Sequence, residues 1–179
     1  MTQHVHHAGC GCLELLSRRR ALGFGVGALA VAAAAGPALA IDQGYEAMLV
    51  KCIDPRFTTN TWAYMSSRGW QNLYSQFNIA GGPIGIVAPV FADWQKTYWD
   101  NLKITYDLHE VKRVVAITHR DCGAAVVAYG ERIKTDRAFE TRTHIDALRQ
   151  FRAEVKKRYP DLMVELGIME LTGAVESVG

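Results

Sequence analysis

Short apolar runs alternate with longer amphipathic stretches along residues 41–179. Four of these runs predict strands, because they are rich in apolar or β-branched residues and are bounded by Gly, Pro or Asp. They cover residues 47–53, 77–80, 111–118 and 162–171, the last interrupted at Gly167. Between them, apolar residues at helical spacing predict helices. These helices cover residues 62–68, the face formed by Phe91, Trp94, Tyr98 and Leu102, and residues 145–159.

The alternation of strands and helices predicts an α/β fold. Parallel strands need crossover connections, and the helices in those connections cover both faces of the sheet. We therefore expect a mainly parallel sheet with helices on both faces. In such sheets, ligands bind at the carboxyl ends of the strands, at the point where the winding reverses. The residues that follow the predicted strands are thus the first candidates for chemistry.

Composition is that of an ordinary globular domain. The chain has 179 residues, of which 49% are hydrophobic and 21% are charged, and this argues against disorder, collagen and coiled coil. The formal net charge of +2 comes from Arg18, Arg19 and Arg20 against Glu14, because the other acidic and basic residues balance. A neutral body without a basic run predicts no binding of nucleic acid. The four cysteines are too few for a disulfide scaffold.

Residues 1–40 are predicted to be a signal peptide, with residues 41–179 as the mature domain. The pair Arg18-Arg19, within Ser-Arg-Arg-x-x-Leu, resembles the twin-arginine export signal. An uncharged stretch rich in Ala and Gly follows, and it ends in the cleavage-type sequence Ala-Leu-Ala at 38–40. We expect an exported protein, periplasmic or extracellular, without membrane contact after cleavage. The alternative is an uncleaved anchor, although Ala and Gly are poor membrane-spanning residues.

A group rich in His and Cys precedes this signal and resembles a metal cluster. Its members are His4, His6, His7, Cys10 and Cys12. Because they lie before the cleavage point, we expect them to be removed with the leader, as part of a biased and disordered segment.

Thiol, imidazole and carboxylate groups follow two of the predicted strands. The first strand runs into Cys-Ile-Asp-Pro-Arg, and in an extended chain Cys52, Asp54 and Arg56 point the same way. The third strand runs into His-Arg-Asp-Cys-Gly, where His119 and Cys122 are spaced to grip one ion as a turn opens a helix. Near a helix N-terminus, the thiolate of Cys122 is electrostatically favoured.

Cys52, His119 and Cys122 together predict one zinc ion per chain. Two thiolates and one imidazole suit zinc, and three protein ligands with one open position are the pattern of a catalytic site. Asp54 is placed to orient a water on the metal, and Arg56 to hold Asp54 by a two-pronged ion pair. The residues alone leave two alternatives, a Cys52–Cys122 disulfide in an exported protein and a purely structural Asp54–Arg56 ion pair.

These motifs resemble those of the β-class carbonic anhydrases. Cys-x-Asp-x-Arg at 52–56 and His-x-x-Cys-Gly at 119–123 are similar to the metal motifs of that family, and residues 165–173 resemble its last strand, which ends in Thr-Gly. The resemblance covers residues 48–175 and is greatest to a small carbonic-anhydrase-like subgroup. It implies a four-stranded sheet of order 2-1-3-4 with an added edge strand and helices on both faces.

The resemblance also implies roles for individual residues. Cys52, His119 and Cys122 are then the zinc ligands, and Asp54 and Arg56 form a catalytic dyad. In some members of the family the aspartate can itself become the fourth ligand and switch the enzyme off. Members of the family complete their active site across a subunit interface, so a homodimer or a higher homo-oligomer is expected.

The function predicted from these residues is the reversible, zinc-dependent hydration of carbon dioxide to bicarbonate. In this mechanism zinc makes hydroxide, and Asp54, held by Arg56, orients it. One alternative is hydrolysis of carbonyl sulfide or carbon disulfide at the same zinc site. Another is an exported zinc-binding protein without turnover.

Residues around the two motifs carry expectations of their own. Asp121 is expected to cap a helix, and Arg120 to be solvated or at an interface. The glycines at 81–82 are expected to form a turn. His109 and His144 lie in helical stretches, and we expect them at the surface or as hydrogen-bonded core residues.

Overall fold

The computed structural model describes residues 44–179. The predicted leader, the cleavage point after Ala40 and the His- and Cys-rich group at 4–12 lie outside the described residues. No helix among residues 44–179 combines the length and the apolar character that a membrane crossing requires.

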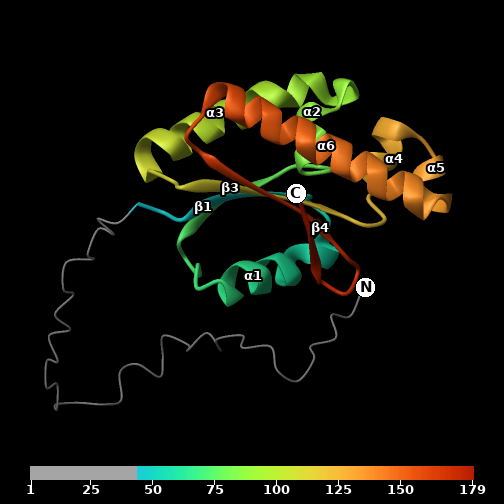
Figure 1. The fold of residues 1–179 in the computed structure, drawn as a ribbon, viewed down its shortest axis with the longest axis horizontal. Helices are drawn as coiled ribbons and strands as arrows, with labels where there is room; N and C mark the ends of the chain where they lie inside the picture. Colours follow the sequence, from blue (N-terminus) through green and yellow to red (C-terminus); the bar gives the residue numbers. More distant parts are fainter. Residues whose placement is uncertain (1–43) are drawn as a thin grey trace, which may run out of the picture. The chain divides into compact units, whose positions relative to one another are not determined.

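Five strands form one sheet, in the order β2-β1-β3-β4-β5. Strand β1 (Ala47–Lys51) lies between β2 (Tyr74–Asn78) and β3 (Arg113–His119), and both pairs are parallel. Strand β4 (Met163–Met169) is parallel to β3, and β5 (Val175–Val178) pairs antiparallel with β4 at the edge. The predicted α/β fold, the order 2-1-3-4 and the added edge strand are therefore confirmed (Figure 1).

Helices cover both faces of this sheet, as predicted. Helix α1 (Thr58–Ser67) lies on one face, and α3 (Ala92–His109) and α6 (Arg137–Arg158) lie on the other (Figure 1). Helix α6 begins earlier than the apolar pattern from residue 145 indicates, because the Asp136 side chain caps it by accepting the Phe139 N–H. The shorter elements are α2 (Pro83–Val87), α4 (Gly123–Tyr129), α5 (Arg132–Thr135) and the 3-10 turns η1 (Pro55–Phe57) and η2 (Pro89–Phe91).

Residues of β1 point alternately into two apolar layers, one on each face of the sheet. Met48 and Val50 belong to the layer beneath α3 and α6, and Ala47 and Leu49 belong to the layer against α1. Burial on both faces explains why β1 and β3 have nearly continuous apolar sequences rather than alternating ones. The apolar pattern therefore predicted these two strands correctly, apart from their ends.

Three expectations about the elements are wrong in detail. Strand β4 runs unbroken through Gly167, where an added Cβ would lie 2.6 Å from Val175, so this glycine permits the close approach of β5. Strand β2 starts at Tyr74 and has half-buried and exposed residues, because it forms an edge of the sheet. Trp94 is exposed and stacks on Phe91 with ring centroids 4.5 Å apart, so it does not share the core face of α3.

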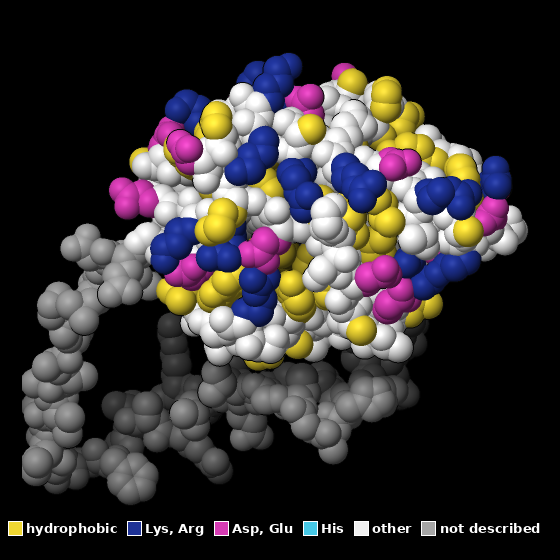
Figure 2. Space-filling view, in the orientation of Figure 1, with side chains coloured by type: hydrophobic (Ala, Val, Ile, Leu, Met, Phe, Trp, Pro, Cys, Tyr) yellow, Lys and Arg dark blue, Asp and Glu magenta, His cyan; other side chains and the backbone are white. Residues whose placement is uncertain are grey.

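Charged side chains of both signs lie interspersed over the face of the molecule seen in Figure 2. The described residues form several exposed ion pairs one helical turn apart, for example Lys96–Asp100 and Arg132–Asp136. Pairs of this kind stabilise a protein by only about 0.3–0.5 kcal/mol each. The two apolar layers, rather than the surface charges, therefore hold the fold together.

The loop from β2 to α2 packs closely against the end of β1. Gly81 and Gly82 both have positive φ, 78° and 56°, so the predicted turn is confirmed. An added Cβ on Gly82 would lie 2.9 Å from the Lys51 carbonyl carbon and 3.0 Å from the Cys52 nitrogen, which are both backbone atoms. The lack of a side chain at Gly82 thus lets this loop lie directly against the residues that end β1.

Gly82→Ala is expected to lower the free energy of unfolding by about 3 kcal/mol, because backbone strain and a backbone clash add together. Gly69→Ala is the matched control, since Gly69 also has positive φ, 75°, but has open space around it. We expect this control to lose only about 1 kcal/mol, from strain alone. Urea unfolding of both variants measures the difference, and equal losses would contradict a role for the contact with β1.

Candidate metal centre

Three potential metal ligands meet at the carboxyl ends of β1 and β3. Cys52 directly follows β1, His119 ends β3, and Cys122 is the N-cap of α4. The ligand atoms of the three residues all lie within 4.8 Å of one another, and all three residues are buried. The structure therefore brings together the three predicted ligands in a group that is able to bind a metal ion.

The imidazole of His119 is held in the tautomer that a metal ligand needs. Its Nδ1 lies 2.8 Å from the carbonyl oxygen of Arg120, and because a carbonyl can only accept, Nδ1 carries the proton. Its Nε2 is buried and has no hydrogen-bond partner among residues 44–179. The Phe57 ring packs against the imidazole, with 4.3 Å between the centroids. A buried nitrogen lone pair without a partner is costly, so this ring fits a bound cation.

The two thiols of the group are free and differ in how readily they ionise. The pKa of Cys52 lies below its usual range, chiefly because of a hydrogen bond with the Cys122 thiol, while burial opposes the shift. The Gly81 N–H also donates to this sulfur, at 3.2 Å. The same shared hydrogen bond, together with burial, raises the pKa of Cys122. The structure has no disulfide between Cys52 and Cys122, and both thiols belong to the group that is able to bind a metal ion.

Asp54 and Arg56 form the predicted two-pronged ion pair. Arg56 Nη2 lies 2.7 Å from Asp54 Oδ2, and Arg56 Nε lies 3.1 Å from both carboxylate oxygens. These hydrogen bonds from the guanidinium are the main reason why the pKa of Asp54 lies below its usual range. Asp54 Oδ2 lies 4.0 Å from His119 Nε2. An ionised carboxylate therefore lies next to the imidazole nitrogen that is free to bind a cation.

The expectation that residues 52–56 stay extended is wrong. Pro55 starts the turn η1 with Asp54 at its N-cap, and the Asp54 side chain accepts a hydrogen bond from the Arg56 N–H at 2.9 Å. Proline favours this geometry because its ring fixes φ at a value suited to the first position of a helix. The turn folds Arg56 back onto Asp54, so the ion pair forms locally and not through strand alternation.

Arg56 also joins the segment that follows β1 to the loop that follows β3. Its Nη1 lies 2.8 Å from Asp121 Oδ2, and its Nη2 lies 3.0 Å from the Asp121 carbonyl oxygen. Asp121 has φ of 55° and directs its side chain to Arg56, whereas the N-cap of α4 is Cys122, which makes no side-chain capping hydrogen bond. The expected helix cap at Asp121 is therefore wrong. Instead, one guanidinium links the segment after β1 to the loop after β3.

Two uncharacterized proteins are similar to this chain in sequence, whereas no family model matches it. One, from Rickettsia bellii, is 28% identical over 131 residues, which cover 73% of this chain and 80% of that protein. The other, from Rickettsia conorii, is also 28% identical over 131 residues, which cover 73% of this chain and 70% of that protein. Both relatives are named as uncharacterized proteins, so their sequence similarity does not indicate a function for this chain.

Solved structures of β-carbonic anhydrases have the same arrangement of elements. A carbonic anhydrase from Glaciozyma antarctica matches with a TM-score of 0.51 and 18% identity, over 80% of this chain and 87% of that chain. A tetrameric β-carbonic anhydrase from Sordaria macrospora matches with a TM-score of 0.51 and 16% identity, over 76% and 82% of the two chains. The β-carbonic anhydrase isoform I of Trichomonas vaginalis matches with a TM-score of 0.50 and 13% identity, over 76% and 85%.

This chain has the β-carbonic anhydrase fold. At such low identities, the likeness shows the fold alone. In this fold the strand order reverses at β1, which has β2 on one side and β3 on the other. The group of Cys52, His119 and Cys122 lies at that reversal, where ligands bind in open parallel sheets.

The loop between His119 and Cys122 contains a buried arginine. Arg120, expected in solvent or at an interface, is only 3% exposed. Its guanidinium contacts Glu170 at 3.0 Å, Glu176 at 3.3 Å, Glu140 at 3.5 Å and the Thr141 hydroxyl at 2.8 Å. The expectation is wrong because these partners come from α6, from β5 and from the residue after β4. No local sequence pattern brings these charges together, so sequence reasoning missed both Arg120 and its acidic partners.

The two remaining histidines of the described chain have different surroundings. His109 Nδ1 lies 2.8 Å from the Ser75 hydroxyl, as expected of a hydrogen-bonded histidine. His144 on α6 is fully buried, and neither of its ring nitrogens has a partner among the described residues, so the expectation is wrong there. Burial lowers the pKa of His144 to about 3, and the positive charge of Arg120 acts in the same direction.

The stability of the metal-free protein is expected to depend on pH through His144. Its pKa is about 3 when folded against an ordinary value of 6.5, so the unfolded chain binds the extra proton and stability falls as the pH drops below 6.5. At about 1.4 kcal/mol per pKa unit, the wild type should lose about 2 kcal/mol between pH 6.5 and about pH 5 that His144→Met does not lose. Denaturant unfolding with a chelator present measures both proteins. If the free energy of unfolding changes with pH in the same way in the wild type and in His144→Met, this role of His144 is contradicted.

Proposed function

We propose that this chain is a zinc-dependent carbonic anhydrase, which reversibly hydrates carbon dioxide to bicarbonate. The observation that carries the proposal is the buried group of Cys52, His119 and Cys122, whose ligand atoms lie within 4.8 Å of one another. Two further observations support it: the β-carbonic anhydrase fold, and the ionised Asp54 at 4.0 Å from His119.

The donor set of the group suits zinc. Zinc accepts thiolate and imidazole ligands, whereas magnesium and calcium prefer oxygen ligands. Cys52, His119 and Cys122 would hold the ion, and three protein ligands leave one position for water or substrate. When bound, zinc supplies the Lewis acid that lets water act as a nucleophile near neutral pH.

Asp54 is the residue that orients the attacking water. Its pKa is lowered chiefly by Arg56, so it is ionised at neutral pH and can only accept hydrogen bonds. A water that donates a hydrogen bond to this carboxylate presents its lone pair in a defined direction. Because positioning of this kind is needed for attack on the carbon of carbon dioxide, Asp54 lowers the barrier to hydration.

Arg56 acts through Asp54 and does not need to touch the substrate. Its Nε and Nη2 hold the Asp54 carboxylate, and its Nη1 is bound to Asp121. This second contact fixes the guanidinium from the other strand end. Asp54 is thereby held in place, and it would not become the fourth ligand of a bound ion.

An apolar pocket that is lined in part by Ile53 suits a small uncharged substrate. Its volume is about 420 Å³, and it is lined by Ile53, Asn78, Ile79, Ala80, Asp93, Trp94 and Thr97. Ile53 lies between Cys52 and Asp54 in the chain, so the pocket and the candidate metal centre share this segment. Carbon dioxide has no net dipole and partitions into such surroundings more readily than bicarbonate, which carries a charge.

Asp54→Asn is expected to retain zinc and to lower kcat/KM for carbon dioxide hydration by roughly 10²-fold or more. Asparagine has nearly the same shape, but its amide carries no negative charge and can donate as well as accept. Arg56→Ala is expected to behave alike, because Asp54 is then free to occupy the open position on the metal. Stopped-flow hydration assays and zinc content, measured on the same samples, check both variants.

Cys122→Ser is the matched control, because it is expected to lose the zinc itself, as are Cys52→Ser and His119→Ala. X-ray absorption of the wild type should show two sulfurs and one nitrogen from the protein. Full zinc occupancy without hydration at any pH up to about 9 would overturn the proposal and leave a zinc-binding protein. Turnover of carbonyl sulfide or carbon disulfide alone would keep the mechanism and change the substrate.

The protein is also proposed to be a homo-oligomer. The Sordaria macrospora enzymes with this fold are described as tetrameric. In this chain, Ile53 and Trp94 are 61% and 38% exposed, and both line the apolar pocket. Within the described residues, β2 also has one unpaired edge. Apolar patches and unpaired strand edges are typical of surfaces that become covered by another chain.

Light scattering at micromolar concentration is expected to give at least twice the mass of one chain. Trp94→Lys is expected to lower this mass, because it places a charge in the apolar patch. Leu108→Lys is the matched control, since Leu108 is 73% exposed on the same helix but lies outside the pocket, and it should leave the mass unchanged. A monomeric wild type with full activity would contradict the assembly.

A further inference from the structure

The peptide unit between Arg120 and Asp121 is held at both ends. Its carbonyl oxygen accepts the hydrogen bond from His119 Nδ1–H at 2.8 Å. Its N–H, which belongs to Asp121, lies 2.9 Å from Glu140 Oε1. A carboxylate, a peptide group and the imidazole of a candidate metal ligand thus form one continuous line of hydrogen bonds.

We infer that Glu140 is a positioning residue for His119 and that it acts through this peptide unit. The inference rests on the proposed function and adds to its site a residue that neither metal motif contains. Glu140 comes from α6 and lies 19 positions from Asp121 in the chain. The contact between Glu140 and Asp121 therefore depends on the tertiary structure and not on a local sequence motif.

The hydrogen bond between Asp121 and Glu140 is of the strong, charge-assisted kind. Glu140 is 4% exposed, so little water competes for its carboxylate. A hydrogen bond to an ionised acceptor is roughly twice as strong as a neutral one. An N–H polarised in this way makes the carbonyl of the same peptide a better acceptor. The His119 ring then donates more strongly from Nδ1 and offers more electron density at Nε2.

The same hydrogen bond keeps the loop in an uncommon backbone conformation. Asp121 has φ of 55°, in the left-handed region that is unfavourable for residues with a side chain. Rotation of the peptide plane would remove its N–H from Glu140 and its carbonyl from His119 at the same time. Glu140 therefore holds both the direction of the imidazole and the path of the chain between His119 and Cys122.

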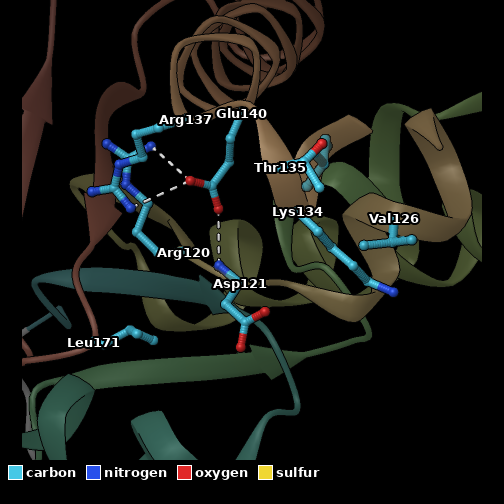
Figure 3. Close-up of a pocket in the computed structure, with 9 residues that line it drawn as sticks. Arg120, Asp121, Val126, Lys134, Thr135, Arg137, Glu140 and Leu171 are labelled. Carbon is cyan, nitrogen blue, oxygen red and sulfur yellow. Dashed lines mark hydrogen bonds and ion pairs between the residues drawn. The ribbon is translucent and has the colours of Figure 1, made fainter. Parts of the chain in front are cut away.

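Two arginines supply the counter-charge of Glu140. Arg120 Nη1 lies 3.5 Å from Glu140 Oε2, and Arg137 Nη1 lies 3.4 Å from the same oxygen. Figure 3 shows both guanidinium groups directed at one carboxylate oxygen, while the other oxygen points to the Asp121 nitrogen. A buried carboxylate needs partners of this kind. Because both arginines contact Oε2, Oε1 can accept the hydrogen bond from the Asp121 N–H.

Charge balance for Arg120 does not by itself require Glu140. Glu170 lies 3.0 Å from Arg120 Nε, and Glu176 lies 3.3 Å from Arg120 Nη2. The Asp121 N–H is bonded to Glu140 and to neither of these. Glu170 is therefore the matched comparison, because its removal takes a negative charge from the same arginine and leaves the peptide bonded.

Glu140→Gln is expected to weaken zinc binding by roughly 10- to 100-fold, the usual effect of changing an outer partner of a metal-binding histidine. Glu170→Gln is expected to bind zinc as tightly as the wild type. Competition for Zn²⁺ against a chromophoric chelator, with the full chain, measures these affinities without reference to carbon dioxide. Equal affinities of the two variants would overturn the inference.

The His119 ring gives a second readout, in the absence of metal. In ¹⁵N-labelled protein, the Nδ1–H proton of His119 should move upfield in Glu140→Gln and stay in place in Glu170→Gln, because a less polarised carbonyl is a weaker acceptor. A loss of stability alone would not move this resonance. If Glu140→Gln does not fold, hydrogen exchange of the wild type tests the inference instead. The Asp121 amide proton should exchange slowly with solvent, because it is bonded to Glu140. Fast exchange there, or a His119 protonated on Nε2, would overturn the inference.

Failure of the proposed function gives different results from failure of this inference. A wild type that binds zinc but does not hydrate carbon dioxide refutes the carbonic anhydrase assignment and leaves the comparison of zinc affinities valid. A wild type that binds no zinc refutes the metal site, and with it the role of Glu140.

Discussion

The parallel pairing of β1 with β3 is the constraint on which the candidate metal centre depends. The paired residues run from Ala47 with Arg113 to Val50 with Ala116, so both strands end at the same edge of the sheet. Both strands are buried on their two faces, and their backbone hydrogen bonds are therefore protected from water. The thiol that follows one strand and the imidazole that ends the other are therefore brought to the same edge of the sheet.

Ion pairs then hold the loops that the sheet leaves free. Arg56 joins the segment after β1 to Asp121, and Arg120 joins the loop after β3 to α6 and to the end of β4. Ion pairs at such sites contribute little net stability, because desolvation offsets much of the attraction. Their effect is on conformation: they select one path for each loop, and the ligand geometry follows from that path.

Three unusual features lie together close to this group. His119 Nε2 is buried without a partner, Asp121 has a left-handed backbone, and Arg120 is buried. Each of these features is unfavourable for folding on its own. Their concentration at one strand end, in a domain whose strands and apolar layers are regular, is typical of a functional site.

The sequence by itself determined the sheet and the ligand group. Apolar and β-branched runs specify buried strands, and Cys52 and His119 lie at the ends of two such runs. That these two strands are neighbours was predicted from the resemblance of the motifs to those of the β-class carbonic anhydrases. The export signal of residues 1–40 stays a prediction from sequence. Only the tertiary structure decided that Arg120 is buried and that Glu140 reaches the loop between the ligands. The charges that meet there are far apart in the chain, and which of them pair depends on how α6, β4 and β5 pack, which no local pattern encodes.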